Sequence, residues 1–120
     1  MFTKFLIRHS IIVLILVFII SFSACSKSAP GCADKETVDL VIQITKDKIV
    51  ENFGQQVADS LELRLDNIRT QNKDNKTGMC LCAAEITSVG PNGSNNIPIT
   101  YKSELIDGND EKFYVTVFGL

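Results

Sequence analysis

Cysteine is the residue type in this sequence with the widest scope for chemistry, and its four copies are unevenly spaced. Cys25 and Cys32 stand in the first third of the chain, whereas Cys80 and Cys82 are separated by one residue. Thiols can form a disulfide, exchange disulfides or bind a soft metal such as copper or zinc. A lone C-x-C pair is weak evidence for a metal, because common zinc motifs place at least two residues between their cysteines.

The residues before Cys25 have the pattern of an export signal. Lys4 and Arg8 supply positive charge, residues 11–20 carry no polar side chain, and small residues follow. As a helix, this apolar run would span about 15 Å, half of the roughly 30 Å hydrocarbon core that a transmembrane helix must cross. We therefore expect a cleaved secretory signal. The alternative is an uncleaved signal anchor with an incidental cysteine.

The end of this segment, Phe22-Ser23-Ala24-Cys25, resembles the lipobox of bacterial lipoproteins, with phenylalanine where leucine is usual. The resemblance implies cleavage before Cys25 by signal peptidase II, a diacylglyceryl group on the thiol, and usually an acylated amine, with palmitate as a typical chain. Two or more acyl chains would anchor the protein stably in a membrane. The same resemblance implies that Ser26, rather than aspartate, after the lipidated cysteine retains the protein at the periplasmic face of the outer membrane in a double-membraned bacterium.

Cleavage would leave 96 of the 120 residues, enough for one small domain. This part lacks histidine because His9 leaves with the signal, which excludes histidine-based catalysis and histidine-ligated metals. Its formal charge of −4, with both signs interspersed, does not favour nucleic-acid binding. No pair of carboxylates stands out. We therefore predict a protein that is not an enzyme, with no catalytic residue, metal or cofactor.

Export would expose the remaining thiols to an oxidising compartment, so a disulfide is expected. Cys80 and Cys82 cannot easily pair with each other, because side chains two apart in a strand diverge beyond disulfide spacing. Cys32 would therefore pair with one of them. Cys82 is favoured because it lies deeper in the predicted strand, which leaves Cys80 as a buried free thiol. The alternative is a thiol-redox or soft-metal site that uses Cys80 and Cys82.

A helix is predicted over residues 35–53. Asp34 can cap its start, and Gly54 is a natural stop. Apolar residues recur at helical spacing between them, namely Val38, Val41, Ile42, Ile49 and Phe53. The alternative takes residues 38–44 as a strand, because β-branched residues are frequent there. Residues 55–59 are expected to be irregular or helical.

After Ser60 the hydrophobic period becomes two, which indicates strands. The first begins near Leu61, and a bulge is expected near Asn67 because Ile68 falls out of phase. Three further strands are predicted over residues 79–88, 97–105 and 112–118, with turns at 72–78, 90–96 and 107–110.

One helix followed by four strands predicts an α+β domain in which the helix covers the apolar face of an antiparallel meander. Ala83 and Ala84 would let the helix approach the sheet closely. The order of elements is similar to that of cystatin-like and NTF2-like domains, a resemblance of architecture without a shared motif. We expect a signal peptide over residues 1–24, a lipidated cysteine and tether over 25–33, and one domain over 34–120.

The last strand carries aromatic residues on both faces. If Phe113 and its apolar neighbours face the helix, Tyr114 and Phe118 lie on the opposite face, where two aromatics could anchor another chain. The alternative is that Phe118 closes the core and a loop half-covers Tyr114. We predict a membrane-anchored, non-catalytic binding, inhibitory or assembly module of the bacterial envelope. Its partners would be the membrane, through Cys25, and an envelope protein.

Overall fold

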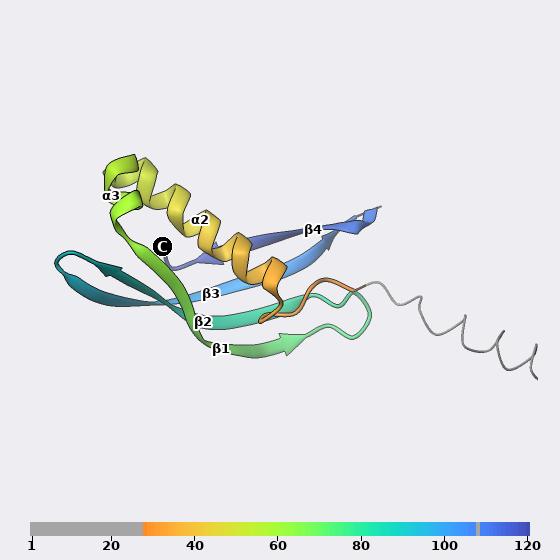
Figure 1. The fold of residues 1–120 in the computed structure, drawn as a ribbon. Coiled ribbons are helices and arrows are strands. Elements are labelled where there is room, and N and C mark those ends of the chain that lie inside the picture. Colours follow the sequence, from red (N-terminus) through yellow and green to blue (C-terminus); the bar gives the residue numbers. More distant parts are fainter. Residues whose placement is uncertain (1–27, 108) are drawn as a thin grey trace, which may run out of the picture.

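The computed structural model describes residues 28–107 and 109–120, and in them a four-stranded antiparallel sheet curls around one long helix (Figure 1). The helices are α2 (Lys35–Phe53) and the short α3 (Gln55–Ser60). The strands are β1 (Glu62–Lys73), β2 (Cys80–Gly90), β3 (Gly93–Ile106) and β4 (Asn109–Phe118), in the order β1-β2-β3-β4. The predicted α+β arrangement is confirmed. The predicted signal and Cys25 lie outside the described residues.

Helix α2 has the limits that the sequence predicts, and the alternative strand over residues 38–44 is wrong. Lys35 and Asp39 form an ion pair one turn apart on its exposed side. The helix ends at Gly54, whose φ of +93° is one that residues with a β-carbon rarely adopt. Neither helix in the described part of the chain is long and apolar enough to span a bilayer.

The side of α2 that packs on the sheet matches the predicted apolar face only in part, at Val41 and Ile42. Thr37, Val41 and Thr45 are its buried residues, and the Thr45 hydroxyl donates to the Val41 carbonyl oxygen at 2.8 Å. Phe53, which the helical spacing assigned to the core, is 69% exposed. The physical reason is that α2 diverges from the sheet toward its C-terminal end, so its last turn stands away from the strands (Figure 1).

The register of the strands decides which residues face α2. Tyr101 of β3 lies opposite both Cys82 of β2 and Val117 of β4, and these three side chains share the helix-facing side. Ala84 also belongs to this core, but Ala83 precedes it in the strand and therefore points to the other face. The expectation that both alanines let the helix approach the sheet closely is wrong for Ala83. The buried core comprises Cys32, Val41, Cys80, Cys82, Ala84, Ile86, Ile99 and Tyr101.

The predicted bulge in β1 is confirmed. The pairing of β1 with β2 shifts register between Asp66 and Arg69, and Asn67 between them has a φ of +54°.

The predicted turn over residues 90–96 is too long, because only Pro91 and Asn92 separate β2 from β3. Residues 94–96 instead pair with β2 as far as Gly93 opposite Gly90. Their polar side chains are exposed, so their polarity does not oppose an extended conformation there. Strand β4 likewise begins at Asn109, within the predicted turn over 107–110.

The described residues ahead of α2 pack on the sheet, although the sequence predicted a loose tether there. Ala29 is 5% exposed and Cys32 is 3% exposed. The Gly31 N–H donates to the Asp34 carboxylate at 2.7 Å, and the Asp34 side chain makes no capping bond to the helix. The packed part of the chain therefore begins several residues before Asp34.

Candidate functional site

The three described cysteines lie at the end of the sheet where this N-terminal segment packs. Cys32 and Cys82 form a disulfide with a Cα–Cα distance of 5.8 Å across 50 residues of sequence, which confirms the predicted pairing. Cys80 is free and 2% exposed, and its Sγ donates to the Gly78 carbonyl oxygen at 3.3 Å.

Tyr101 makes a second link between the N-terminal segment and the sheet. Its hydroxyl donates to the Cys32 carbonyl oxygen at 2.8 Å, and burial raises the pKa of Tyr101 to about 12. Sequence reasoning missed this role of Tyr101. The disulfide and the Tyr101 hydrogen bond together fix the start of the domain to the two central strands.

The arrangement of the cysteines bears on the redox and metal alternative. Cys82 is oxidised, so the C-x-C pair does not present two thiols, and the remaining Cys80 thiol is buried. Ser103 lies opposite Cys80, and its hydroxyl is buried without a hydrogen-bond partner in the described structure. Among residues 28–107 and 109–120, no group of three or more histidine, cysteine, aspartate or glutamate side chains is placed to hold a metal ion.

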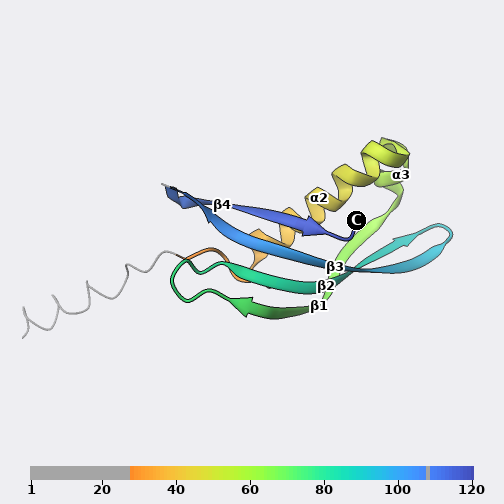
Figure 2. The same cartoon turned by 180° about the vertical axis from the view of Figure 1, so that it is seen from behind.

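The sheet face opposite α2 carries the two aromatic residues that the sequence assigned to partner binding. No described helix lies on that face (Figure 2). Tyr114 is 47% exposed and Phe118 is 50% exposed, so both are available for contact. The alternative in which Phe118 closes the core is wrong, because Phe118 pairs with the exposed Thr100 while Val117 beside it faces the core.

Polar side chains flank Tyr114 on this face. Glu104 lies directly opposite Tyr114, and the Lys102 ammonium is 3.2 Å from the Glu104 carboxylate. Hydrogen bonding to the Tyr114 phenol lowers the pKa of Glu104, and the same contact raises the pKa of Tyr114. The aromatic surface is therefore the pair Tyr114 and Phe118 with a charged, hydrogen-bonded margin. We call this pair the aromatic face.

Sequence reasoning missed a hollow between the C-terminal half of α2 and the sheet, which we call the α2 groove. Its volume is about 170 Å³. Its apolar lining comes from α2, from three strands and from the segment after β4, and includes Ile49, Phe53, Leu63, Ile86, Ile97 and Leu120. The groove exists because α2 diverges from the sheet, a tertiary feature without a local sequence signal.

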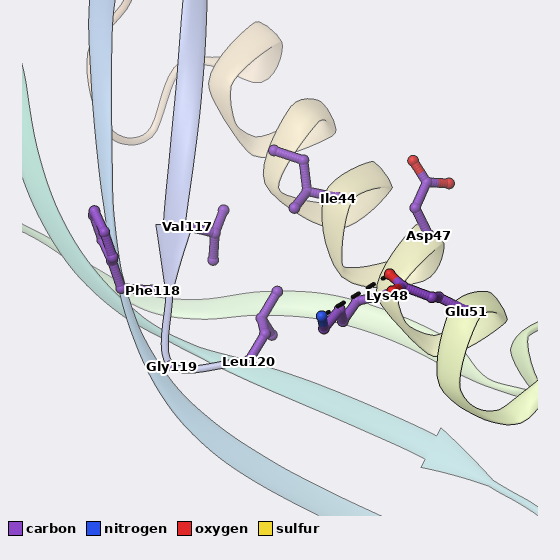
Figure 3. A pocket seen from close by; sticks show the side chains of 8 residues that line it. All are labelled: Ile44, Asp47, Lys48, Glu51, Val117, Phe118, Gly119 and Leu120. Carbon is purple, nitrogen blue, oxygen red and sulfur yellow. Dashed lines mark ion pairs between the residues drawn. The ribbon is translucent and has the colours of Figure 1, made fainter.

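A second, more polar hollow of about 560 Å³ lies between α2 and the end of β4 (Figure 3). Val117 and Leu120 point toward the helix in this view, whereas Phe118 points to the other side of its strand. Lys48 borders both hollows, and its ammonium is 3.9 Å from the Glu51 carboxylate.

The size of the α2 groove limits what it can accept. Small-molecule and cofactor pockets usually measure about 300–1,000 Å³. The α2 groove is smaller, and it suits one or two apolar side chains of a protein better than a cofactor. Two surfaces are thus available for a protein partner, the aromatic face and the α2 groove.

Comparison of the chain with known protein families, with curated proteins and with solved structures finds no match in any of the three. The likeness to cystatin-like and NTF2-like domains stays a prediction from the order of the elements.

Proposed function

We propose that this protein is a lipid-anchored, non-catalytic module of the bacterial envelope that captures another envelope protein through the aromatic face. The observation that carries the proposal is the half exposure of Tyr114 and Phe118 on one side of β4, on a sheet face that no described helix covers. Protein interfaces are enriched in aromatic anchors surrounded by a polar margin. The aromatic face has both features.

The position of β4 at the edge of the sheet adds a second means of contact. It pairs with β3 on one side, and an edge strand offers backbone N–H and C=O groups that an extended segment of a partner can pair with. Side chains at alternate positions would then confer specificity. Such a mode suits an inhibitor, an immunity factor or an assembly subunit, each of which acts by occupying a partner.

Membrane attachment in this proposal depends on the lipobox. Cys25 lies outside the described residues, and the support for its lipidation is the order of charged, apolar and small residues before it. Ser26 supports retention at the periplasmic face of the outer membrane. The helix-on-meander arrangement agrees with a cystatin-like domain, a class that the proposal adopts for the architecture alone.

The test is capture of a partner from native membranes with the anchor intact. We expect the double variant Tyr114→Ser/Phe118→Ser to lose the partner that the unaltered protein retains, while the cooperative thermal transition persists. The matched control is Phe53→Ser, which removes an aromatic that is more exposed and belongs to the α2 groove. Retention of the partner by the double variant, or its loss in the control alone, would contradict the proposed surface.

A further inference from the structure

The packing of the first described residues constrains how the domain stands on a membrane. Ala29 and Cys32 are buried, Cys32 is bonded to Cys82, and Tyr101 holds the Cys32 carbonyl. Gly78 lies so close to Ser28 that a β-carbon on Gly78 would come within 2.3 Å of the Ser28 side chain. The chain is therefore fixed to the domain from Ser28 onward.

The distance from this fixed point to the proposed anchor is short. Cys25 precedes Ser28 by three residues, which reach at most about 11 Å when fully extended. A lipidated Cys25 would sit at the level of the head groups, so the surface around Ser28 has to lie close to the same level. A free tether over residues 25–33 would have allowed three times that distance and any orientation.

The fold shows which end of the molecule contains Ser28. Ser28 lies beside the turn between β1 and β2, and the turn between β3 and β4 lies at the same end (Figures 1 and 2). Helix α3 and the Pro91-Asn92 turn lie at the opposite end. The 11 residues of β2 span about 36 Å between the two ends at 3.3 Å per residue.

We infer that the domain stands on the phospholipid surface on the end formed by the turn over residues 74–78, with the Pro91-Asn92 turn directed away from the bilayer. The inference rests on the proposed lipidation of Cys25. The membrane-proximal end carries the exposed Lys73 and Lys76 together with the exposed Asp74 and Asp107, so its charges nearly balance, and the exposed Ile106 can enter the head-group region. A phospholipid surface is therefore the neighbour of this end because of the short link from Cys25 to Ser28, and not because of its charge.

This orientation places Tyr114 of the aromatic face nearer the membrane than the α2 groove. Cys80, at the membrane-proximal end of β2, pairs with Ser103 of β3. The next residue of β3, Glu104, pairs with Tyr114, so Tyr114 lies at the same end of the sheet. The α2 groove includes Ile86, about 20 Å farther along β2. A partner that contacts Tyr114 would thus reach close to the membrane.

The test attaches a fluorophore to a single introduced cysteine in the full, membrane-extracted protein, reconstituted in phospholipid vesicles with a quencher on the lipid head group. Asn75→Cys places the label in the membrane-proximal turn, and Asn92→Cys places it at the far end. Both positions are exposed, and the native Cys80 thiol is buried against labelling. We expect the label at position 75 to lose most of its fluorescence and the label at position 92 to lose none.

A second variant tests whether the short link between Cys25 and Ser28 causes this orientation. A flexible Gly/Ser insertion between Lys27 and Ser28 should abolish the difference between the two labels while the protein stays in the vesicles. Equal quenching at both positions in the unextended protein, or stronger quenching at position 92, would overturn the orientation and leave the aromatic face untouched. Failure of the protein to carry acyl chains by intact mass would overturn the anchor and the orientation together, whereas the capture experiment tests the aromatic face separately.

Discussion

Breaking the Cys32–Cys82 disulfide should remove a large share of the stability of this domain. The bond closes a loop of 50 residues, and the chain-entropy relation gives about 4 kcal/mol for a loop of that length. A domain of this size has a free energy of unfolding of about 5–10 kcal/mol. The double variant Cys32→Ala/Cys82→Ala is therefore expected to be close to the limit of folding, with a melting temperature lowered by roughly 20 °C.

Urea unfolding of the double variant measures this loss, and Cys80→Ala supplies the matched control. Cys80 is buried in the same cluster, so its replacement measures the packing loss for one sulfur atom, about 1 kcal/mol, without opening a loop. Any loss in the double variant beyond twice the control value belongs to the cross-link. The slope with urea should also rise, because the unfolded chain without the bond is less compact. A loss no larger than twice the control value would refute the reasoning.

Three further predictions concern the same end of the molecule. Gly78→Ala should destabilise the domain more than Gly93→Ala, as measured by thermal unfolding. Both glycines have positive φ, but only Gly78 lies close to another segment. Equal losses of stability would argue against the packed N-terminal segment. Thiol titration of the exported protein should find one free thiol, Cys80, that reacts only after denaturation, and a thiol that reacts in the folded state would favour the redox alternative. Because the pKa of Tyr101 is raised to about 12, the stabilisation by its protonated phenol is intact below pH 10 and is lost as the pH rises toward 12. A Tyr101→Phe variant should therefore lose less stability than the unaltered protein over that range. An equal loss of stability in both proteins would contradict this prediction.

Local signals explain the parts of the fold that the sequence predicted well. Gly54 stops α2 because its backbone conformation suits glycine, and the phase change at Ile68 reveals the bulge at Asn67. Strand geometry excluded a bond between Cys80 and Cys82, because side chains two apart in a strand do not meet. Cys82 was preferred to Cys80 because it lies deeper in the predicted strand. Each of these depends on a few neighbouring residues.

The parts that the sequence predicted wrongly depend on how elements pack. Phe53 continues the helical spacing, yet it is exposed because α2 leaves the sheet before its last turn. The same divergence creates the α2 groove, which no sequence motif predicts. The segment before Asp34 is rich in small residues and looked like a tether, but the disulfide at Cys32 and the absent side chain of Gly78 let it pack closely.

Photo-crosslinking in intact cells tests the central claim most directly, because it reports the neighbours of the aromatic face with the anchor in place. A photoreactive phenylalanine analogue at position 118 should yield a discrete heavier species in the membrane fraction, and the same analogue at position 53 should not. No product at position 118, or the same product from both positions, would contradict partner capture through Tyr114 and Phe118.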